Sequence, residues 1–231
     1  MNNLCEWIKP REIEEIEPVV SKYYIFCEGE QTEPNYFEGF KKYIELNAIY
    51  KNIVQITIEG LGKETERILN YAIDYVNNKK ISDAKIWCVY DKDSFPAEHF
   101  NNVSERIRTM NKSPNNNIKY YGAWSNQCIE YWFILHFNYY DADNDRSYYI
   151  ENLNKNFKIK ELGVYHKSKD KEIFDKLSLK GNPKLAIKHA KRRIKECKGQ
   201  SDTNSSPATK VYELVEELAN YLPADMKQFY L

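Results

Sequence analysis

Short apolar runs alternate with longer amphipathic segments through the first half of the chain. The runs are rich in β-branched and aromatic residues, as expected of buried strands. They are "YYIFCEG" (23–29), "IVQITIEG" (53–60), "KIWCVYD" (85–91) and "IKYYGAWSN" (118–126). We expect four strands at these positions.

The segments between the runs have helical spacing. In "PNYFEGFKKYIELN", Pro34 is well placed as a first helical residue, and in 63–80 the apolar side chains recur every three or four positions. Another helix is expected over 96–111. Strands alternating with helices predict an α/β fold with an open, mostly parallel four-stranded sheet flanked by helices. If the strand order is the usual 2-1-3-4, the first and third strands are neighbours.

Strand patterns stop after Asn126, and the remaining periodicity is helical. Helices are expected in 127–137, 148–160, 171–179, 183–197 and 207–222, and the polar, turn-rich segment 198–210 is expected to be a linker. We therefore predict an α/β domain over 20–138 and a helical C-terminal region over 139–231 that packs on it.

The amino-acid composition argues against several classes of protein. The 34 basic and 34 acidic residues cancel, so overall charge does not indicate a nucleic-acid partner. Five cysteines without a CxxC pair favour neither a zinc module nor a disulfide framework. The absence of a signal peptide or a long apolar stretch predicts a soluble, cytoplasmic protein without a membrane partner.

Acidic residues stand where two of the predicted strands end. Glu28 follows the first strand and Asp91 ends the third, and these strands are neighbours in the order 2-1-3-4. Asp93 lies two residues further along an extended backbone, so its side chain should point the same way as that of Asp91. Three carboxylates at one place favour Mg²⁺ or Mn²⁺ and a phosphoryl substrate. The alternative is that "DKDSF" is an acidic turn or a helix cap.

Three motifs in this order resemble the RloB family of bacterial proteins with a Toprim-type domain. They are "CEGEQTEPNYF", "VYDKDSF" and "SNQCIEYWFILHF", and the later "NSSPATKVYELVEEL" is similar to the end of the family pattern. The resemblance covers about residues 20–222 and implies a Toprim-like fold. It also implies that Glu28 is an acid/base or metal ligand, and that Asp91 and Asp93 are metal ligands for Mg²⁺-dependent phosphodiester chemistry.

Within that resemblance we expect a nuclease. The chain has no room for a separate strand-cleaving domain, as in topoisomerases, and no cysteine module, as in bacterial primases. RloB-like proteins resemble phage-defence or restriction-associated factors with an ATPase partner. The alternative is a non-catalytic regulatory subunit that binds nucleotide or nucleic acid. The sequence does not distinguish DNA from RNA.

Two further segments contain candidate residues. "SNQCIEYWFILHF" is expected to begin a buried helix, with Ser125 or Asn126 as its cap and Glu130 as a fourth acid near the metal, or simply as a packed residue; His136 is expected in the core. In "GVYHKSKDKE", Lys167 could stabilise charge on a phosphate, although a solvated loop is the simpler interpretation.

One helix has a strong local charge. Residues 180–199 contain eight basic side chains and one acid, a net charge of +7 in a neutral chain. Ile187, Ala190, Ile194 and Cys197 form an apolar stripe. The cations that could track a nucleic-acid backbone lie on an adjoining face: Lys184, Lys188, Lys191, Arg192 and Lys195. An ordinary solvated face is the alternative.

Overall fold

The chain forms an α/β structure whose elements follow the predicted order. The computed structural model describes residues 20–62, 65–92, 96–113 and 117–231. Its strands are β1 (Ser21–Cys27), β2 (Val54–Gly60), β3 (Ala84–Asp91), β4 (Ile118–Asn126) and β5 (Ala208–Thr209). The larger helices are α1 (Thr32–Leu46), α2 (Thr65–Asn78), α3 (Ala97–Met110), α5 (Arg146–Ile159), α7 (Pro183–Glu196) and α8 (Val211–Ala219). The shorter ones are α4 (Ile129–Ile134), α6 (Ile173–Lys180) and α9 (Ala224–Lys227).

The sheet has the order β2-β1-β3-β4-β5, and its first four strands are parallel. This confirms the mostly parallel sheet, and the first four strands have the usual order 2-1-3-4 on which the expected meeting of the first and third strands depends. Cys27 lies opposite Val89, so β1 and β3 end side by side in the middle of the sheet. Parallel neighbours bring their carboxyl ends to the same edge, which is where ligands bind in open α/β sheets.

The prediction of four strands is wrong, because a fifth strand forms within the segment expected to be a linker. Ala208 and Thr209 pair antiparallel with Asn126 and Ser125 of β4. A two-residue strand is too short to produce an apolar run, and its partner lies more than eighty positions earlier in the sequence, as the Ser125–Thr209 hydroxyl contact shows. The same pairing explains why α8 begins at Val211 rather than at the predicted residue 207.

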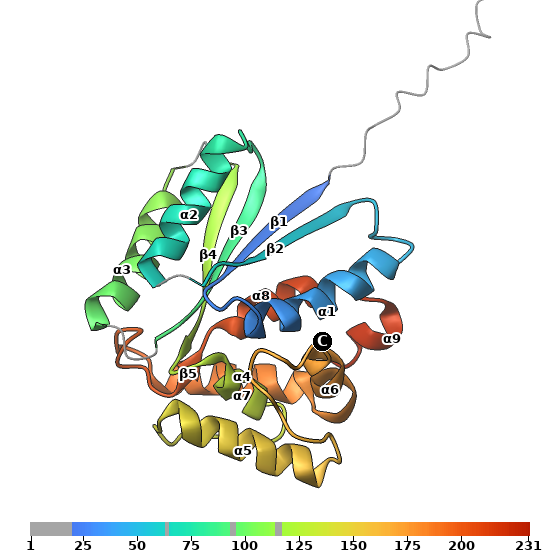
Figure 1. Cartoon of the computed structure of the whole chain (residues 1–231). Helices are drawn as coiled ribbons and strands as arrows, with labels where there is room; N and C mark the ends of the chain where they lie inside the picture. Colours follow the sequence, from blue (N-terminus) through green and yellow to red (C-terminus); the bar gives the residue numbers. More distant parts are fainter. Residues whose placement is uncertain (1–19, 63–64, 93–95, 114–116) are drawn as a thin grey trace, which may run out of the picture.

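Side chains of the central strands alternate between two buried layers. In β3, Trp87 and Val89 join a cluster with α1 and α8, whereas Ile86 and Cys88 join a second cluster with α2 and α3. Figure 1 shows α2 and α3 on one face of the sheet and α1 and α8 on the other. The period-2 alternation that predicted the strands thus places helices on both faces.

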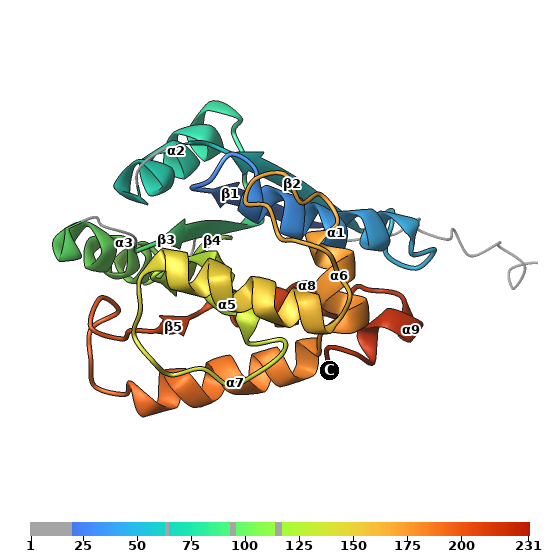
Figure 2. The same ribbon diagram turned by 60° about the horizontal axis from the view of Figure 1, so that its bottom comes forward.

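The remaining helices gather below the face that α1 and α8 cover (Figure 2). Buried residues of this layer, such as Trp132, Leu153 and Phe174, belong to the same apolar cluster as Tyr23 and Ile25 of β1. The core is therefore continuous from the sheet into the C-terminal helices. No helix in the described ranges has the length and apolar character needed to cross a membrane.

Candidate functional site

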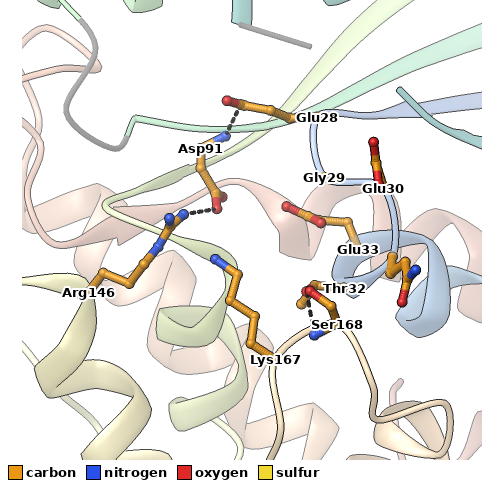
Figure 3. Close-up of a pocket in the computed structure, with 10 residues that line it drawn as sticks. Glu28, Gly29, Glu30, Thr32, Glu33, Asp91, Arg146, Lys167 and Ser168 are labelled. Carbon is orange, nitrogen blue, oxygen red and sulfur yellow. Dashed lines mark hydrogen bonds and ion pairs between the residues drawn. The ribbon is translucent and has the colours of Figure 1, made fainter. Parts of the chain in front are cut away.

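A pocket of about 310 Å³ lies where β1 and β3 end (Figure 3). It is formed by the turn after β1, the first residues of α1, the end of β3, the start of α5 and the loop before α6. Its lining residues are Glu28, Gly29, Glu30, Gln31, Thr32, Glu33, Asp91, Arg146, Lys167 and Ser168. Three of the predicted site residues, Glu28, Asp91 and Lys167, are among them.

Glu28 and Asp91 meet because their strands are hydrogen-bonded neighbours. The Glu28 amide donates to the Val89 carbonyl at 2.9 Å, which continues the β1–β3 ladder beyond β1. The Asp91 amide in turn donates to Glu28 Oε2 at 2.9 Å. A hydrogen bond from a backbone amide fixes the orientation of the Glu28 carboxylate against the tip of β3.

Glu33 is a second buried acid at this pocket, and its carboxylate lies close to the backbone of Gly29. A Cβ atom on Gly29 would lie 2.1 Å from Glu33 Oε2, so a larger residue there would require the Glu33 carboxylate to move. Glu33 is 4% exposed, and within the described part of the chain its Oε2 has no hydrogen-bond partner. Burial, with a smaller contribution from the charge of Glu130, raises the pKa of Glu33 to about 7, although a backbone hydrogen bond and the charge of Lys167 act in the opposite direction.

Two cations face these acids. Arg146, the first residue of α5, reaches Asp91 Oδ2 with its guanidinium nitrogen at 3.3 Å. Figure 3 shows the amino group of Lys167 pointing into the space between Asp91 and Glu33. The pocket therefore has an acidic wall and a basic wall, an arrangement that can accept a metal-bound phosphate.

The loop that carries Lys167 is tied to the start of α1. The amide of Ser168 donates to Thr32 Oγ1 at 3.2 Å, and Ser168 has a positive φ of 68°. That conformation is uncommon for a residue other than glycine, and it persists only where the surroundings hold it. The contact with Thr32 thus helps to hold the loop, and Lys167 with it, at the pocket.

Glu130 lies in the first turn of α4 and is fully buried. Its Oε1 accepts a hydrogen bond from the Tyr165 hydroxyl at 3.0 Å, and it is not one of the residues that line the pocket. The prediction that Ser125 or Asn126 caps this helix is wrong. Both residues end β4, and the N-cap position belongs to Cys128, because pairing with β5 extends the strand to Asn126.

His136 is a core residue, as predicted. It is 2% exposed, and its Nδ1 lies 3.1 Å from the Trp132 carbonyl oxygen, to which it can donate. Burial lowers the pKa of His136 to about 4, so the ring is neutral at physiological pH.

The carboxylate oxygens at this pocket are of the kind that Mg²⁺ prefers as ligands. Glu28 and Asp91 supply carboxylate oxygens, and Mg²⁺ commonly uses one or two protein carboxylates together with water and substrate oxygens. Among the described residues, no group of three or more acids, histidines or cysteines is arranged to hold a metal ion. Asp93, the third predicted ligand, lies outside the described residues.

The basic helix α7 packs as predicted. Its apolar stripe is buried or half-buried at Ile187, Ala190, Ile194 and Cys197. The cations of the adjoining face are exposed, and none of them lines the pocket. Figure 2 shows α7 along the lower edge of the molecule, with α8 between it and α1.

Several of these cations have partners on the protein. Lys191 pairs with Glu216 at 2.5 Å, and Lys184 donates to the Leu231 carbonyl oxygen. Arg192 pairs with Glu196 at 2.8 Å and stacks on the ring of Tyr139. Within the described ranges, Lys188 and Lys195 make no ion pair.

Sequence reasoning missed Glu33, Arg146 and Tyr165 as residues in or around the site. Glu33 stands in the acid-rich stretch after β1, and the high density of glutamates in this stretch could have indicated it as a site residue. Arg146 begins a helix, where a positive charge opposes the helix dipole, and this mismatch is also visible in the sequence. Tyr165 gave no local signal, because only the fold brings it to Glu130.

Comparison with known proteins gives one match. A family model described as RloB-like protein matches residues 23–218. No curated protein and no solved structure matches the chain.

Proposed function

This chain belongs to the RloB-like family, and on that premise we propose that it is a nuclease that uses Mg²⁺ or Mn²⁺ to cleave phosphodiester bonds. The observation that carries the proposal is the meeting of Glu28 and Asp91 at the ends of two central parallel strands, opposite Arg146 and Lys167. Acids at this edge of the sheet also support a Toprim-type assignment. As part of the same proposal, the enzyme acts in a bacterial defence or restriction-associated system with an ATPase partner.

In this proposal Glu28 and Asp91, together with Asp93, would hold the cation. When bound, it would polarise a phosphoryl oxygen and lower the pKa of a coordinated water. Glu28 is oriented for this task by the Asp91 amide, and Asp91 by its position at the end of β3.

Lys167 and Glu33 would stabilise negative charge and transfer a proton, respectively. Lys167 places an ammonium group in the pocket, where it can offset the negative charge that develops on the phosphate. Glu33, with its pKa raised to about 7 by burial, can hold or release a proton at Oε2 near neutral pH. A general acid at this position could protonate the leaving oxygen.

The test is cleavage of single-stranded DNA, duplex DNA and RNA pools by the purified chain, with Mg²⁺, with Mn²⁺ and with a chelator. We expect cleavage that requires the metal and that falls about a hundredfold or more in Glu28→Gln and in Asp91→Asn. The matched control is Glu38→Gln, which neutralises an exposed glutamate of α1 outside the pocket and should cleave at the wild-type rate.

Cleavage that persists after chelation and in both pocket variants would exclude this mechanism. A chain that binds Mn²⁺ yet hydrolyses no pool, alone or with an ATPase partner, would instead be a regulatory subunit that uses the same pocket for binding.

A further inference from the structure

The ion pair between Arg146 and Asp91 joins a fixed partner to one that can move. The Asp91 side chain is 5% exposed and belongs to the last residue of a central strand. The Arg146 side chain is 35% exposed and enters the pocket from the first residue of α5. The Arg146 guanidinium, which is the more exposed partner, can therefore change position more readily than the buried Asp91 carboxylate.

Arg146 gains little from its own helix. The unpaired amides at a helix N-terminus carry partial positive charge, so a cation there is unfavourable. The three residues Asp141, Asp143 and Asp145 precede it, and an ion pair joins its guanidinium to Asp91, 55 positions away. The ion pair with Asp91 therefore helps to hold Arg146 at the pocket.

Asp91 is also one of the two described carboxylates that would hold a divalent cation under the proposed function. A cation bound to Asp91 and a guanidinium 3.3 Å from Asp91 Oδ2 would place like charges close together in a largely buried site. Such charges repel strongly where water screens them poorly. One of the two must leave.

A displaced Arg146 would have a second partner within the same pocket. Guanidinium groups bind phosphate oxygens through a planar pair of N–H donors, and this geometry is the reason that arginine is common in phosphate sites. Lys167 approaches the pocket from the loop before α6, so the two cations would contact a phosphate from different elements.

Building on the proposed function, we propose that Arg146 and a divalent cation compete for Asp91, and that the displaced Arg146 binds a phosphate oxygen of the nucleic-acid substrate. The pair thus keeps Asp91 neutralised until a cation arrives. Arrival of the cation then frees the arginine for the substrate.

The competition is tested by Mn²⁺ affinity, which is measured by isothermal titration without any substrate. Arg146→Gln removes the competing charge, so it should bind Mn²⁺ about tenfold more tightly than the wild type. Arg146→Lys keeps the charge and should stay within about threefold of the wild type. Arg146→Met is a second neutral variant in case Arg146→Gln does not fold.

The phosphate contact is tested by the affinity for a fluorescent oligonucleotide in Ca²⁺, which occupies carboxylate sites with little turnover. Arg146→Gln should bind it about tenfold more weakly than the wild type, through loss of a charged hydrogen-bond pair. The matched control is Lys155→Gln, which removes an exposed, ion-paired cation from the same helix and should change neither affinity.

The outcomes separate this inference from the proposed function. If the wild type binds no Mn²⁺, the metal site and the nuclease proposal both fail. If the wild type binds Mn²⁺ but Arg146→Gln binds it equally or more weakly, competition is refuted and the nuclease proposal stands. If Mn²⁺ affinity rises while oligonucleotide affinity is unchanged, the contact between Arg146 and the substrate phosphate is refuted.

Discussion

At the scale of single residues, burial shifts the pKa values of two titratable groups in opposite directions. It raises the pKa of Glu33 and lowers the pKa of His136, because in each case the charged form is the one that loses hydration. For Glu33 the consequence is a proton available near neutral pH at the pocket. For His136, which packs away from the pocket in the turn that follows α4, the consequence is a pH-dependent stability.

The His136 effect has a definite sign. Its pKa is about 4 in the folded protein and 6.5 in the unfolded chain, so between these values the unfolded state binds the extra proton. Stability therefore falls as the pH drops from 6.5 towards 4, and at pH 5 the loss is about 2 kcal/mol relative to pH 7.5. Denaturant unfolding at the two pH values should show that His136→Gln narrows the difference in unfolding free energy by about this amount.

His166 supplies the control for this measurement, because it is an exposed loop histidine. His166→Gln should leave the difference between pH 7.5 and pH 5 as it is in the wild type. A His136→Gln variant with the wild-type difference would show that the buried ring does not contribute to acid sensitivity.

At the scale of elements, α7 combines a buried apolar stripe with an exposed cationic face. Part of its charge is compensated by Glu216 and Glu196, which lowers the field that the helix presents to a partner. The exposed Lys188 and Lys195 contribute charge without such compensation among the described residues. The helix therefore keeps the features of a surface that follows a phosphate backbone without reading bases.

This role predicts a loss of affinity that is independent of sequence. Changing Lys188, Lys191 and Arg192 to glutamate should weaken binding to all oligonucleotides and flatten the salt dependence of log K by up to about three units of slope. Fluorescence anisotropy at several salt concentrations provides the measurement. Unchanged affinity and slope would assign this face to ordinary solvated surface.

A matched charge reversal is available near the amino-terminal ends of the strands, at the end of the sheet away from the pocket. Lys51, Lys79 and Lys112 are exposed residues in the turns and connections that lead into strands. Changing all three to glutamate alters the net charge by the same amount. If this control weakens binding as much as the α7 variant does, the effect is one of overall charge and not of the helix.

At the scale of the whole molecule, the C-terminal helices complete the core of the sheet. Leu214 and Leu218 of α8 are buried in the cluster that contains Ile25 of β1. The Tyr23 hydroxyl of β1 donates to Glu217 of α8 at 2.8 Å, across 194 positions of sequence. Removing the C-terminal region would expose the part of one sheet face that α8 covers, and it would leave the edge of β4 without β5.

We therefore predict that a fragment of residues 20–138 does not fold as a cooperative unit, although the alternation of strands and helices is complete within it. The full chain should unfold in a single thermal transition, whereas the fragment should show a broad one and poor dispersion of its amide NMR signals. A fragment with a sharp transition and a dispersed spectrum would show that the α/β part is an independent domain.

The sequence by itself determined the features that depend on local pattern. Alternating apolar runs identified β1 to β4, helical spacing identified the helices on both faces, and strand-end acids marked Glu28 and Asp91 as neighbours. These inferences succeed because strand and helix periods are short, and because parallel strands in a common order must end at one edge.

Only the tertiary structure decided the contacts between residues far apart in the chain. β5 meets β4 across 84 positions, Arg146 meets Asp91 across 55, and Tyr165 meets Glu130 across 35. None of these pairs has a periodic signature. Each forms because packing of the whole core brings its partners together, and a buried polar group then takes the partner that lies within reach.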